Sequence, residues 1–313
     1  MPFDLDRVAE RFDLGIDAVL DGRSDRGEQG MVCKVVSARG AFAVKTMFEA
    51  WSEAEVAGPA TYQQLVHAAG VNVPGIVRTI DGTVLADIDG ATVRVYEWVE
   101  LRERDPLLDP VAVGTTAAAI HRVRWVKGTE VHPWYTEAVG AARWSELRDA
   151  AADAHAPFDT DLARLHDGLI ALESLLEVPT DLQTCHCDLW ADNLLATSNG
   201  ELCVIDWENA GPADPSQELC LLLYEFGGND ASRCRALYDA YVAAGGPGRV
   251  DRPGNFSTVI AQVCHINELA VSRWLGEGST AAQRAHDASL FGEFVDRPLT
   301  LGLIDDILAA IHP

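Results

Sequence analysis

Hydrophobic and polar residues alternate in short runs over the first hundred positions, a pattern typical of strands separated by tight turns. Two β-rich runs at 31–36 and 41–48 are joined by the turn Ala38-Arg39-Gly40, which predicts a hairpin. A helical stretch over 61–70 follows and ends at Gly70. Asp-Gly pairs then mark turns between further short strands. These strands are predicted at 75–80, 83–88 and 91–100.

After about residue 110 the spacing of apolar residues changes to three and four, which predicts helices. The predicted helices cover residues 111–123, 161–177, 216–227, 231–246, 256–275 and 300–311. The chain is therefore expected to be α+β, with a small β-rich N-terminal lobe and a larger, mainly helical C-terminal lobe. The junction is expected near YEWVEL, residues 96–101, which divides the chain into domains 1–98 and 99–313.

The charge of the chain limits its partners. Its 313 residues carry a formal net charge of −24, and its isoelectric point is about 4.6. Such a surface repels nucleic acid and anionic membranes and attracts cationic small molecules, although acidity also serves solubility alone. The first residues do not resemble a secretion signal, and the apolar runs are shorter than a membrane helix requires. We therefore expect a cytoplasmic protein whose seven cysteines remain reduced.

The stretch CHCDLWADN, from Cys185 to Asn193, carries the densest polar chemistry in the chain. It has three interpretations: an ordinary polar turn, a metal site or a catalytic loop. Structural zinc usually takes ligands two to four residues apart in two separated pairs. Cys185, His186 and Cys187 are adjacent, and the sequence contains neither C-x-x-C nor H-x-x-x-H. The spacing therefore disfavours zinc.

The catalytic-loop interpretation accounts for residues outside this stretch as well. The apolar run ELCVI delivers Asp206 downstream, and far upstream Lys45 lies within the apolar run AFAVKTM. Phosphoryl transfer from ATP requires such a set. It needs a carboxylate for the attacking hydroxyl, an Asn and an Asp for Mg²⁺, and a strand lysine for the phosphates.

These residues resemble a known family. HCDLWADN fits the H-x-D-x-x-x-x-N catalytic loop of the aminoglycoside phosphotransferase family, relatives of choline kinases and protein kinases. IDWENAGPADPSQEL looks like the second motif of that family, and AVK at 43–45 looks like its strand lysine. The motifs follow the family order along nearly the whole chain. The resemblance implies a bilobal protein-kinase-like fold, ATP and Mg²⁺ as cofactors, and a small-molecule acceptor with a hydroxyl group.

The resemblance also implies roles for individual residues. Asp188 is expected to be the catalytic base, mainly by orienting the hydroxyl, and His186 to organise the catalytic loop. Asn193 and Asp206 are expected to bind Mg²⁺, which prefers oxygen ligands. Lys45 is expected to contact the α- and β-phosphates of the nucleotide.

Two further segments are expected to bind the nucleotide. Gly27, Gln29 and Gly30 occupy the turn that would cover the phosphates, where glycine permits close backbone approach. YEWVE would be the hinge, with the main chain of Glu97 and Val99 meeting the adenine.

Two details stay open in the sequence. Kinase-like folds pair the strand lysine with a helix glutamate, and the candidates are Glu53 and Glu55, of which we prefer Glu55. Because proline is excluded from helix interiors, the helix is expected to begin near Pro59 and leave both residues at or before its N-terminus. Asp214 is expected either to brace the catalytic loop or to cap the helix that starts at Ser216.

The residues that bind the acceptor are the hardest to predict from the sequence. Trp190 and Asp192 lie inside the catalytic loop and are expected near the acceptor. The segment QVCHINELAVSRWL contributes Asn267, Glu268 and Trp274, although its apolar spacing equally suits a core helix. The aromatic loop HPWYTE, residues 132–137, is a similar candidate.

Together these residues predict an ATP-dependent O-phosphotransferase, a small-molecule kinase. The acidic surface favours an aminoglycoside or amino-sugar acceptor. One alternative is a kinase of a metabolite such as a sugar, choline or homoserine. Another is a non-catalytic nucleotide-binding regulator, against which the intact set of Lys45, Asp188, Asn193 and Asp206 argues.

Overall fold

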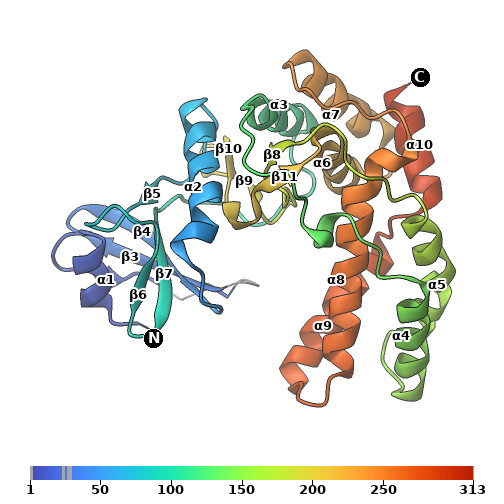
Figure 1. Cartoon of the computed structure of the whole chain (residues 1–313), viewed down its shortest axis with the longest axis horizontal. Coiled ribbons are helices and arrows are strands. Elements are labelled where there is room, and N and C mark those ends of the chain that lie inside the picture. The colour runs from blue at the N-terminus through green and yellow to red at the C-terminus, as the bar shows by residue number, and fades with distance from the viewer. Residues whose placement is uncertain (1–2, 23–24, 27–29, 313) are drawn as a thin grey trace. The chain divides into compact units, whose positions relative to one another are not determined.

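The computed structural model describes residues 3–22, 25–26 and 30–312 (Figure 1). The chain packs as two compact units. The first contains Met1–Asp105 and His186–Gly211, and the second contains Pro106–Cys185 and Pro212–Pro313. The catalytic-loop segment therefore packs with the N-terminal sheet, whereas the sequence division assigned it to the C-terminal lobe. The predicted ranges 1–98 and 99–313 remain a prediction about which lobe binds the nucleotide and which the acceptor.

The first unit is built on an antiparallel sheet whose main path runs β1-β3-β4-β7-β5, with β2 beside β3 and β6 beside β7. The predicted hairpin is confirmed, since β3 and β4 pair from Gly30↔Met47 to Ser37↔Gly40. The strands are β1 (Val19–Leu20), β2 (Asp25–Arg26), β3 (Gly30–Ser37), β4 (Gly40–Met47), β5 (Ile76–Val77), β6 (Ala86–Ile88) and β7 (Ala91–Glu97).

The predicted strands at 75–80 and 83–88 are shorter than expected. Thr79 and Thr83 bond to each other through both main chain and side chain, with 3.0 Å from Thr79 N to Thr83 O and 2.7 Å between their hydroxyls. These contacts close a tight turn around Asp81-Gly82. The flanking residues consequently leave the sheet ladder.

The two faces of this sheet differ in chemistry because side chains alternate along a strand. Val44 and Val95 are directly opposite each other and belong to the apolar core, together with residues of α1 (Leu5–Arg11). Lys45 and Arg94 form the next pair along and project from the other face. The sheet thus places two buried cations side by side, away from the core that α1 covers.

Helix α2 (Glu53–Ala68) begins earlier than expected. Ser52 is its N-cap, and Ser52 and Glu55 form a reciprocal capping box. This box secures the first turn, so the helix continues through Pro59, which lies inside it. The expectation that the helix begins near Pro59 is therefore wrong: the capping box fixes the first turn, and the helix also buries Val56 and Ala60 on either side of the proline.

The segment from His186 onward adds a small ribbon to the first unit. Strands β9 (Leu194–Ala196) and β10 (Leu202–Val204) pair antiparallel. A short 3₁₀ turn, η2 (Trp207–Asn209), follows directly. It packs against α2, where the rings of Tyr62 and Trp207 meet edge to face at 5.8 Å.

The second unit is mainly helical, and its long helices α8 and α9 lie side by side (Figure 1). The predicted helices are present, while α4 and α9 were not predicted. The helices are α3 (Pro110–His121), α4 (Ala141–Asp153), α5 (Asp159–Glu173), α6 (Pro215–Leu222), α7 (Ala231–Ala243), α8 (Ser257–Leu275), α9 (Ala281–Asp296) and α10 (Leu301–Ile311). Shorter elements are η1 (Pro133–Tyr135), the π-turn η3 (Leu223–Gly227), η4 (Pro253–Phe256) and the strand pair β8 (Gln183–Cys185) and β11 (Gly211–Ala213).

Two further features concern the whole fold: the apolar character of its helices and the state of its cysteines. Among the described residues, no helix combines the length and the apolar character needed to cross a membrane. All seven cysteines are buried thiols without a disulfide. They therefore act as small apolar side chains.

Candidate active site

The β9–β10 ribbon brings the two expected magnesium ligands to one end of the same structure. Asn193 directly precedes β9, and Asp206 follows β10 after one residue. The ladder continues between them, since Ile205 N donates to Asn193 O at 2.9 Å. Asp206 adopts the left-handed conformation, with φ +60° and ψ +61°. This turn directs the chain into η2.

Asp188 is held by two side-chain amides. Its Oδ2 atom accepts hydrogen bonds from Asn193 Nδ2 at 2.9 Å and from Asn209 Nδ2 at 3.1 Å. Burial raises the pKa of Asp188 to about 6, aided by the nearby charges of Asp192 and Glu208, although the two amides act in the opposite direction. The carboxylate is thus fixed in orientation while its Oδ1 atom accepts no hydrogen bond from the described chain.

The residues fit a divalent cation by the chemistry of their donors. Asn193 uses its Nδ2 atom on both Oδ2 and the main-chain oxygen of Asp188, each at 2.9 Å. Its Oδ1 atom is the remaining polar group and takes no hydrogen bond within the described residues. Together with the Asp206 carboxylate it supplies oxygen donors of the kind that Mg²⁺ prefers.

Lys45 lies between two carboxylates from the segment that follows β10. Its Nζ atom forms ion pairs with Asp206 Oδ1 and, at 3.1 Å, with Glu208 Oε1. Burial lowers the pKa of Lys45, but Glu208 and Asp206 outweigh burial, so the pKa is raised above its ordinary value. Lys45 is therefore a fixed cation at the same end of the ribbon as Asp206.

Glu208 is also the partner of the second buried cation. Its Oε1 atom lies 2.8 Å from Arg94 Nη1, and the Tyr96 hydroxyl donates to the same oxygen at 3.1 Å. The guanidinium of Arg94 lies over the Tyr96 ring, 5.1 Å from its centroid. Burial opposes ionisation of Glu208, yet Arg94 and Lys45 hold its pKa well below the ordinary value. Burial and the adjacent Glu208 charge raise the pKa of Asp206.

His186 is placed as an organising residue. It is fully buried, and its Nε2 atom lies 3.0 Å from Ile205 O, to which it donates. Its ring meets Trp207 edge to face at 4.5 Å. His186 thus ties the start of the catalytic loop to the segment that carries Asp206. These contacts are those expected of a supporting residue.

The segment expected to contact adenine begins at the end of strand β7. Glu97 N donates to Gly75 O at 2.8 Å, and Trp98 N to Ala41 O at 3.0 Å. The main chain of Val99 forms no hydrogen bond within the described residues. Its groups therefore remain available to a ligand such as adenine.

The phosphate-covering turn is described only at its end. Gly30 begins β3, and a side chain there would collide with Thr46 O, 2.3 Å from the Cβ position. Glycine is therefore required at residue 30 by the close approach of two strands. Gly27 and Gln29 lie outside the described residues.

The expected pairing of Lys45 with Glu55 is not found in the described part of the chain. The Glu55 carboxylate accepts from Ser52 N at 2.7 Å and from its hydroxyl at 2.6 Å. Glu53 accepts from Val84 N at 2.9 Å and from Leu85 N at 3.0 Å. Glu55 is therefore committed to the capping box at Ser52, and Glu53 to the main chain at Val84 and Leu85.

The acceptor residues predicted inside the catalytic loop belong to the first unit. Trp190 O accepts from Asn193 N at 2.9 Å and from Leu194 N at 3.0 Å, which shapes the turn of the loop. Asp192 is exposed and forms an ion pair with Arg104 Nε at 3.0 Å. Any acceptor role of Asp192 would have to compete with this arginine.

The remaining acceptor candidates lie on α8 in the second unit. Glu268 Oε1 accepts from Arg143 at 2.7 Å and from Ser272 Oγ at 2.8 Å. Asn267 is buried and donates to Val263 O at 2.7 Å within its own helix. The Trp274 ring meets Phe158 edge to face at 5.4 Å, and Trp134 of HPWYTE stacks on His265 at 4.9 Å.

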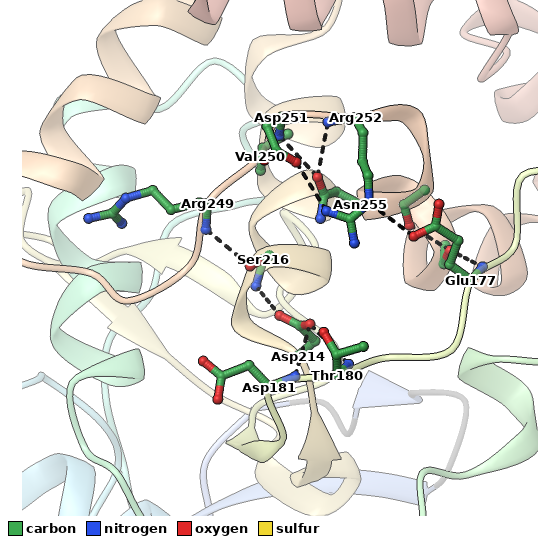
Figure 2. A network of polar contacts seen from close by, with 12 residues as sticks. Glu177, Thr180, Asp181, Asp214, Ser216, Arg249, Val250, Asp251, Arg252 and Asn255 are labelled. Carbon is green, nitrogen blue, oxygen red and sulfur yellow. Dashed lines mark hydrogen bonds and ion pairs between the residues drawn. The ribbon is translucent and has the colours of Figure 1, made fainter.

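Asp214 follows the catalytic loop in sequence and contacts the segment that precedes the loop. Figure 2 shows its carboxylate between Ser216 and the chain at Thr180 and Asp181. Oδ1 accepts from Ser216 N at 2.8 Å and caps α6, while Oδ2 accepts from Thr180 N and Asp181 N at 3.4 Å each. The capping role is confirmed, and the same carboxylate also fixes the approach to β8.

A buried polar cluster in the second unit brings together His121, Cys185 and Glu218. His121 Nε2 lies 2.6 Å from Glu218 Oε2, and its Nδ1 lies 2.8 Å from the Tyr241 hydroxyl. Both ring nitrogens are therefore already engaged. The cluster is a satisfied core network, and the motif cysteine Cys185 packs within it.

Sequence reasoning missed Arg94 and Asn209, and it considered Glu208 only as a source of negative potential for an amine-bearing acceptor. Glu208 and Asn209 were visible as the residues that follow Asp206 in IDWEN, and only their direction was unknown. Arg94 carried a weaker signal, a basic residue between two valines of β7. Its partner comes from a distant segment, which strand alternation alone cannot identify.

The fold and these residues together define a kinase-like phosphotransferase. The model of the Phosphotransferase enzyme family matches residues 25–253. The chain belongs to this family and is accordingly a small-molecule phosphotransferase with a hydroxyl acceptor. No curated protein matches the chain in sequence.

Solved structures agree with the fold at low sequence identity. A spectinomycin phosphotransferase bound to ADP and spectinomycin has a TM-score of 0.69 at 14% identity, with 98% of this chain and 97% of that chain covered. An aminoglycoside phosphotransferase from Alicyclobacillus acidocaldarius gives 0.60 at 19%, covering 91% and 92%. A choline/ethanolamine kinase family protein from Mesorhizobium loti gives 0.54 at 19%, covering 93% and 92%. These similarities establish the protein-kinase-like fold.

Proposed function

We propose that this protein transfers the γ-phosphate of ATP to a hydroxyl of an amine-bearing small molecule, an aminoglycoside or amino-sugar-like acceptor. The observation that carries the proposal is the Asp188 carboxylate. It is fixed by Asn193 and Asn209 through Oδ2 and leaves Oδ1 for an incoming hydroxyl. Asp188 would orient this hydroxyl and accept its proton as phosphoryl transfer proceeds.

Nucleotide and metal have distinct places in the proposal. Lys45 would contact the α- and β-phosphates, and Asn193 and Asp206 would bind Mg²⁺, which neutralises phosphate charge when bound. The main chain of Glu97 and Val99 would meet the adenine, and the turn at Gly27, Gln29 and Gly30 would cover the phosphates. Similar structures with bound ADP or AMP support the use of an adenine nucleotide.

The acceptor class rests on charge and on the similar structures. A net charge of −24 favours a cationic acceptor. Trp190, Asp192 and the α8 residues Asn267, Glu268 and Trp274 are the side chains we propose to test for acceptor binding. A cytoplasmic location would suit a consumer of ATP whose cysteines are all reduced.

A second acceptor class, small amino alcohols, is supported by two similar structures. One is the choline/ethanolamine kinase family protein, and the other is a microcompartment-associated aminopropanol kinase with a TM-score of 0.59 at 16% identity, covering 94% of this chain and 95% of that chain. Both acceptor classes combine a hydroxyl group with an amine. The acidic surface suits either.

The test is Mg²⁺-dependent release of ADP from ATP across a panel of acceptors. The panel contains aminoglycosides, amino sugars, choline, ethanolamine, homoserine and neutral sugars. Asp188→Asn is the matched blank because it keeps the size of the side chain. Acceptor-dependent release that is lost in the variant supports the proposal. A preference for a neutral sugar removes the cationic acceptor, and ATP binding without turnover on the full panel favours a non-catalytic regulator.

A further inference from the structure

The carboxylate that fixes Lys45 comes from an unexpected part of the chain. Kinase-like folds draw this partner from the helix that follows the lysine strand. Here both acids of the first turn of α2 are bonded elsewhere, Glu55 to Ser52 and Glu53 to Val84 and Leu85. Glu208, from η2, instead lies 3.1 Å from the Lys45 ammonium.

We propose that Glu208 is the positioning residue for Lys45 in nucleotide binding, and that Arg94 and Tyr96 lock it in place. This inference rests on the proposed function. Glu208 Oε1 contacts three groups: it lies 3.1 Å from Lys45 Nζ, 2.8 Å from Arg94 Nη1 and 3.1 Å from the Tyr96 hydroxyl. All of these contacts lie within the first unit.

Burial makes this arrangement rigid. The side chains of Glu208 and Arg94 are each 1% exposed, and that of Lys45 is 10% exposed. A buried charge is costly unless an opposite charge neutralises it, so Glu208 and Arg94 require each other. Lys45 and Arg94 also stand opposite each other on β4 and β7, which fixes their separation through the sheet.

The two carboxylates on Lys45 would then have different tasks. Asp206 is an expected Mg²⁺ ligand, so its contact with Lys45 would weaken once the metal is bound. Glu208 is already neutralised by Arg94, and would keep Lys45 in position without cancelling its charge. The ammonium would remain available to the phosphates. In this arrangement, α2 is not needed to align the lysine.

The test measures ADP affinity without metal, in EDTA, by titration calorimetry, so that turnover is not required. Glu208→Gln and Lys45→Met should each weaken ADP binding about tenfold, as expected for loss of a coupled contact. Because Glu208 acts through Lys45, adding Glu208→Gln to Lys45→Met should cause less than a twofold further change. Glu55→Gln is the matched control and should leave ADP affinity unchanged.

Folding is checked separately, since Glu208→Ala would leave Arg94 buried without a partner. Glu208→Gln keeps the shape of the side chain, and the pair Glu208→Gln with Arg94→Met removes both charges. In steady-state assays the KM for ATP should rise while the KM for the acceptor stays constant. A folded Glu208→Gln variant with wild-type ADP affinity would overturn the inference, as would additive effects of Glu208→Gln and Lys45→Met. If the unaltered protein bound ADP but turned over no acceptor, the proposed function would be wrong. The comparison of ADP affinities among the variants would still decide the role of Glu208.

Discussion

The side-chain amide of Asn193 donates to Oδ2 of Asp188 at 2.9 Å, and this contact gives both residues a defined remaining oxygen. Asp188 keeps Oδ1, and Asn193 keeps its own Oδ1. The first is suited to a hydroxyl proton and the second to a hard cation. One hydrogen bond thus aligns the proposed base with a proposed metal ligand, and phosphoryl transfer needs both groups held in position.

Replacing Asp188 by Asn should separate activity from stability. The variant keeps an oxygen for the amides of Asn193 and Asn209 but offers no proton acceptor. We expect kcat to fall by about 10²–10⁴-fold, while ADP affinity changes little. Measurements are ADP release at saturating substrates and titration calorimetry. Turnover within twofold of wild type would show that Asp188 is not the base.

The raised pKa of Asp188 predicts the pH profile of the reaction. Because burial raises its pKa to about 6, the ionised form is lost as pH falls through 6. The logarithm of kcat/KM should decrease with a slope of one below about pH 6. A profile that stays flat down to pH 5 at saturating Mg²⁺ would contradict a role for Asp188 ionisation.

The same shift predicts how stability depends on pH. The folded state holds the Asp188 proton up to about pH 6, whereas the unfolded chain releases it near the ordinary aspartate pKa of 3.8. Between these values the folded state binds more protons, so this group lowers the free energy of unfolding as pH rises. Asp188→Asn should therefore gain about 1–3 kcal/mol over wild type above pH 6. The gain should shrink toward pH 4. Chemical denaturation at several pH values measures it.

Much of this site could be predicted from sequence because local order determined it. The motif spacing placed Asp188 and Asn193 in one loop, and the apolar run before Asp206 predicted its strand. The Lys45 partner could not be predicted in this way. Glu53 and Glu55 lie near Lys45 in sequence order, but capping of α2 uses one and the backbone at Val84 the other. The choice of Glu208 depends on where a distant segment folds, and pattern reasoning does not give that.

Helix boundaries show the same limit of prediction from local sequence. Pro59 predicted a later start for α2, since proline lacks a donor. The capping box at Ser52 is equally local, but the helix is also held by tertiary packing of Val56, Ala60 and Tyr62, which the local pattern does not weigh. The π-turn at Leu223–Gly227 was read as ordinary helix for a related reason: its apolar spacing matches both forms.

Asp206→Asn should reveal the metal dependence of nucleotide binding. The variant removes one charge that would hold Mg²⁺ and also frees Lys45 from one ion pair. We expect ADP affinity in EDTA to be maintained or improved, while the gain in affinity on adding Mg²⁺ is lost. Calorimetric titrations with and without Mg²⁺ measure both quantities. A wild-type response to Mg²⁺ would argue that Asp206 is not a ligand.

His186→Ala tests the support of the catalytic loop. The side chain is fully buried, donates to Ile205 O and packs against Trp207. Its removal should cost about 2–4 kcal/mol of unfolding free energy, from a cavity and an unsatisfied carbonyl. His186→Gln, which can still donate to Ile205 O, should recover part of both stability and kcat. If both variants kept wild-type stability and His186→Gln lost as much kcat as His186→Ala, the result would instead indicate that His186 transfers a proton directly.

Ser52→Ala tests whether α2 matters to the nucleotide at all. The substitution removes the N-cap oxygen and half of the capping box, so unfolding free energy should fall by about 1 kcal/mol. Because Lys45 is paired with Glu208 and Asp206, the KM for ATP should stay within twofold of wild type. Glu55→Gln, which weakens the same box, should behave alike. If either variant raised the KM for ATP tenfold at unchanged stability, the first turn of α2 would contact the nucleotide site, and Glu55 would regain the role that the sequence predicted for it.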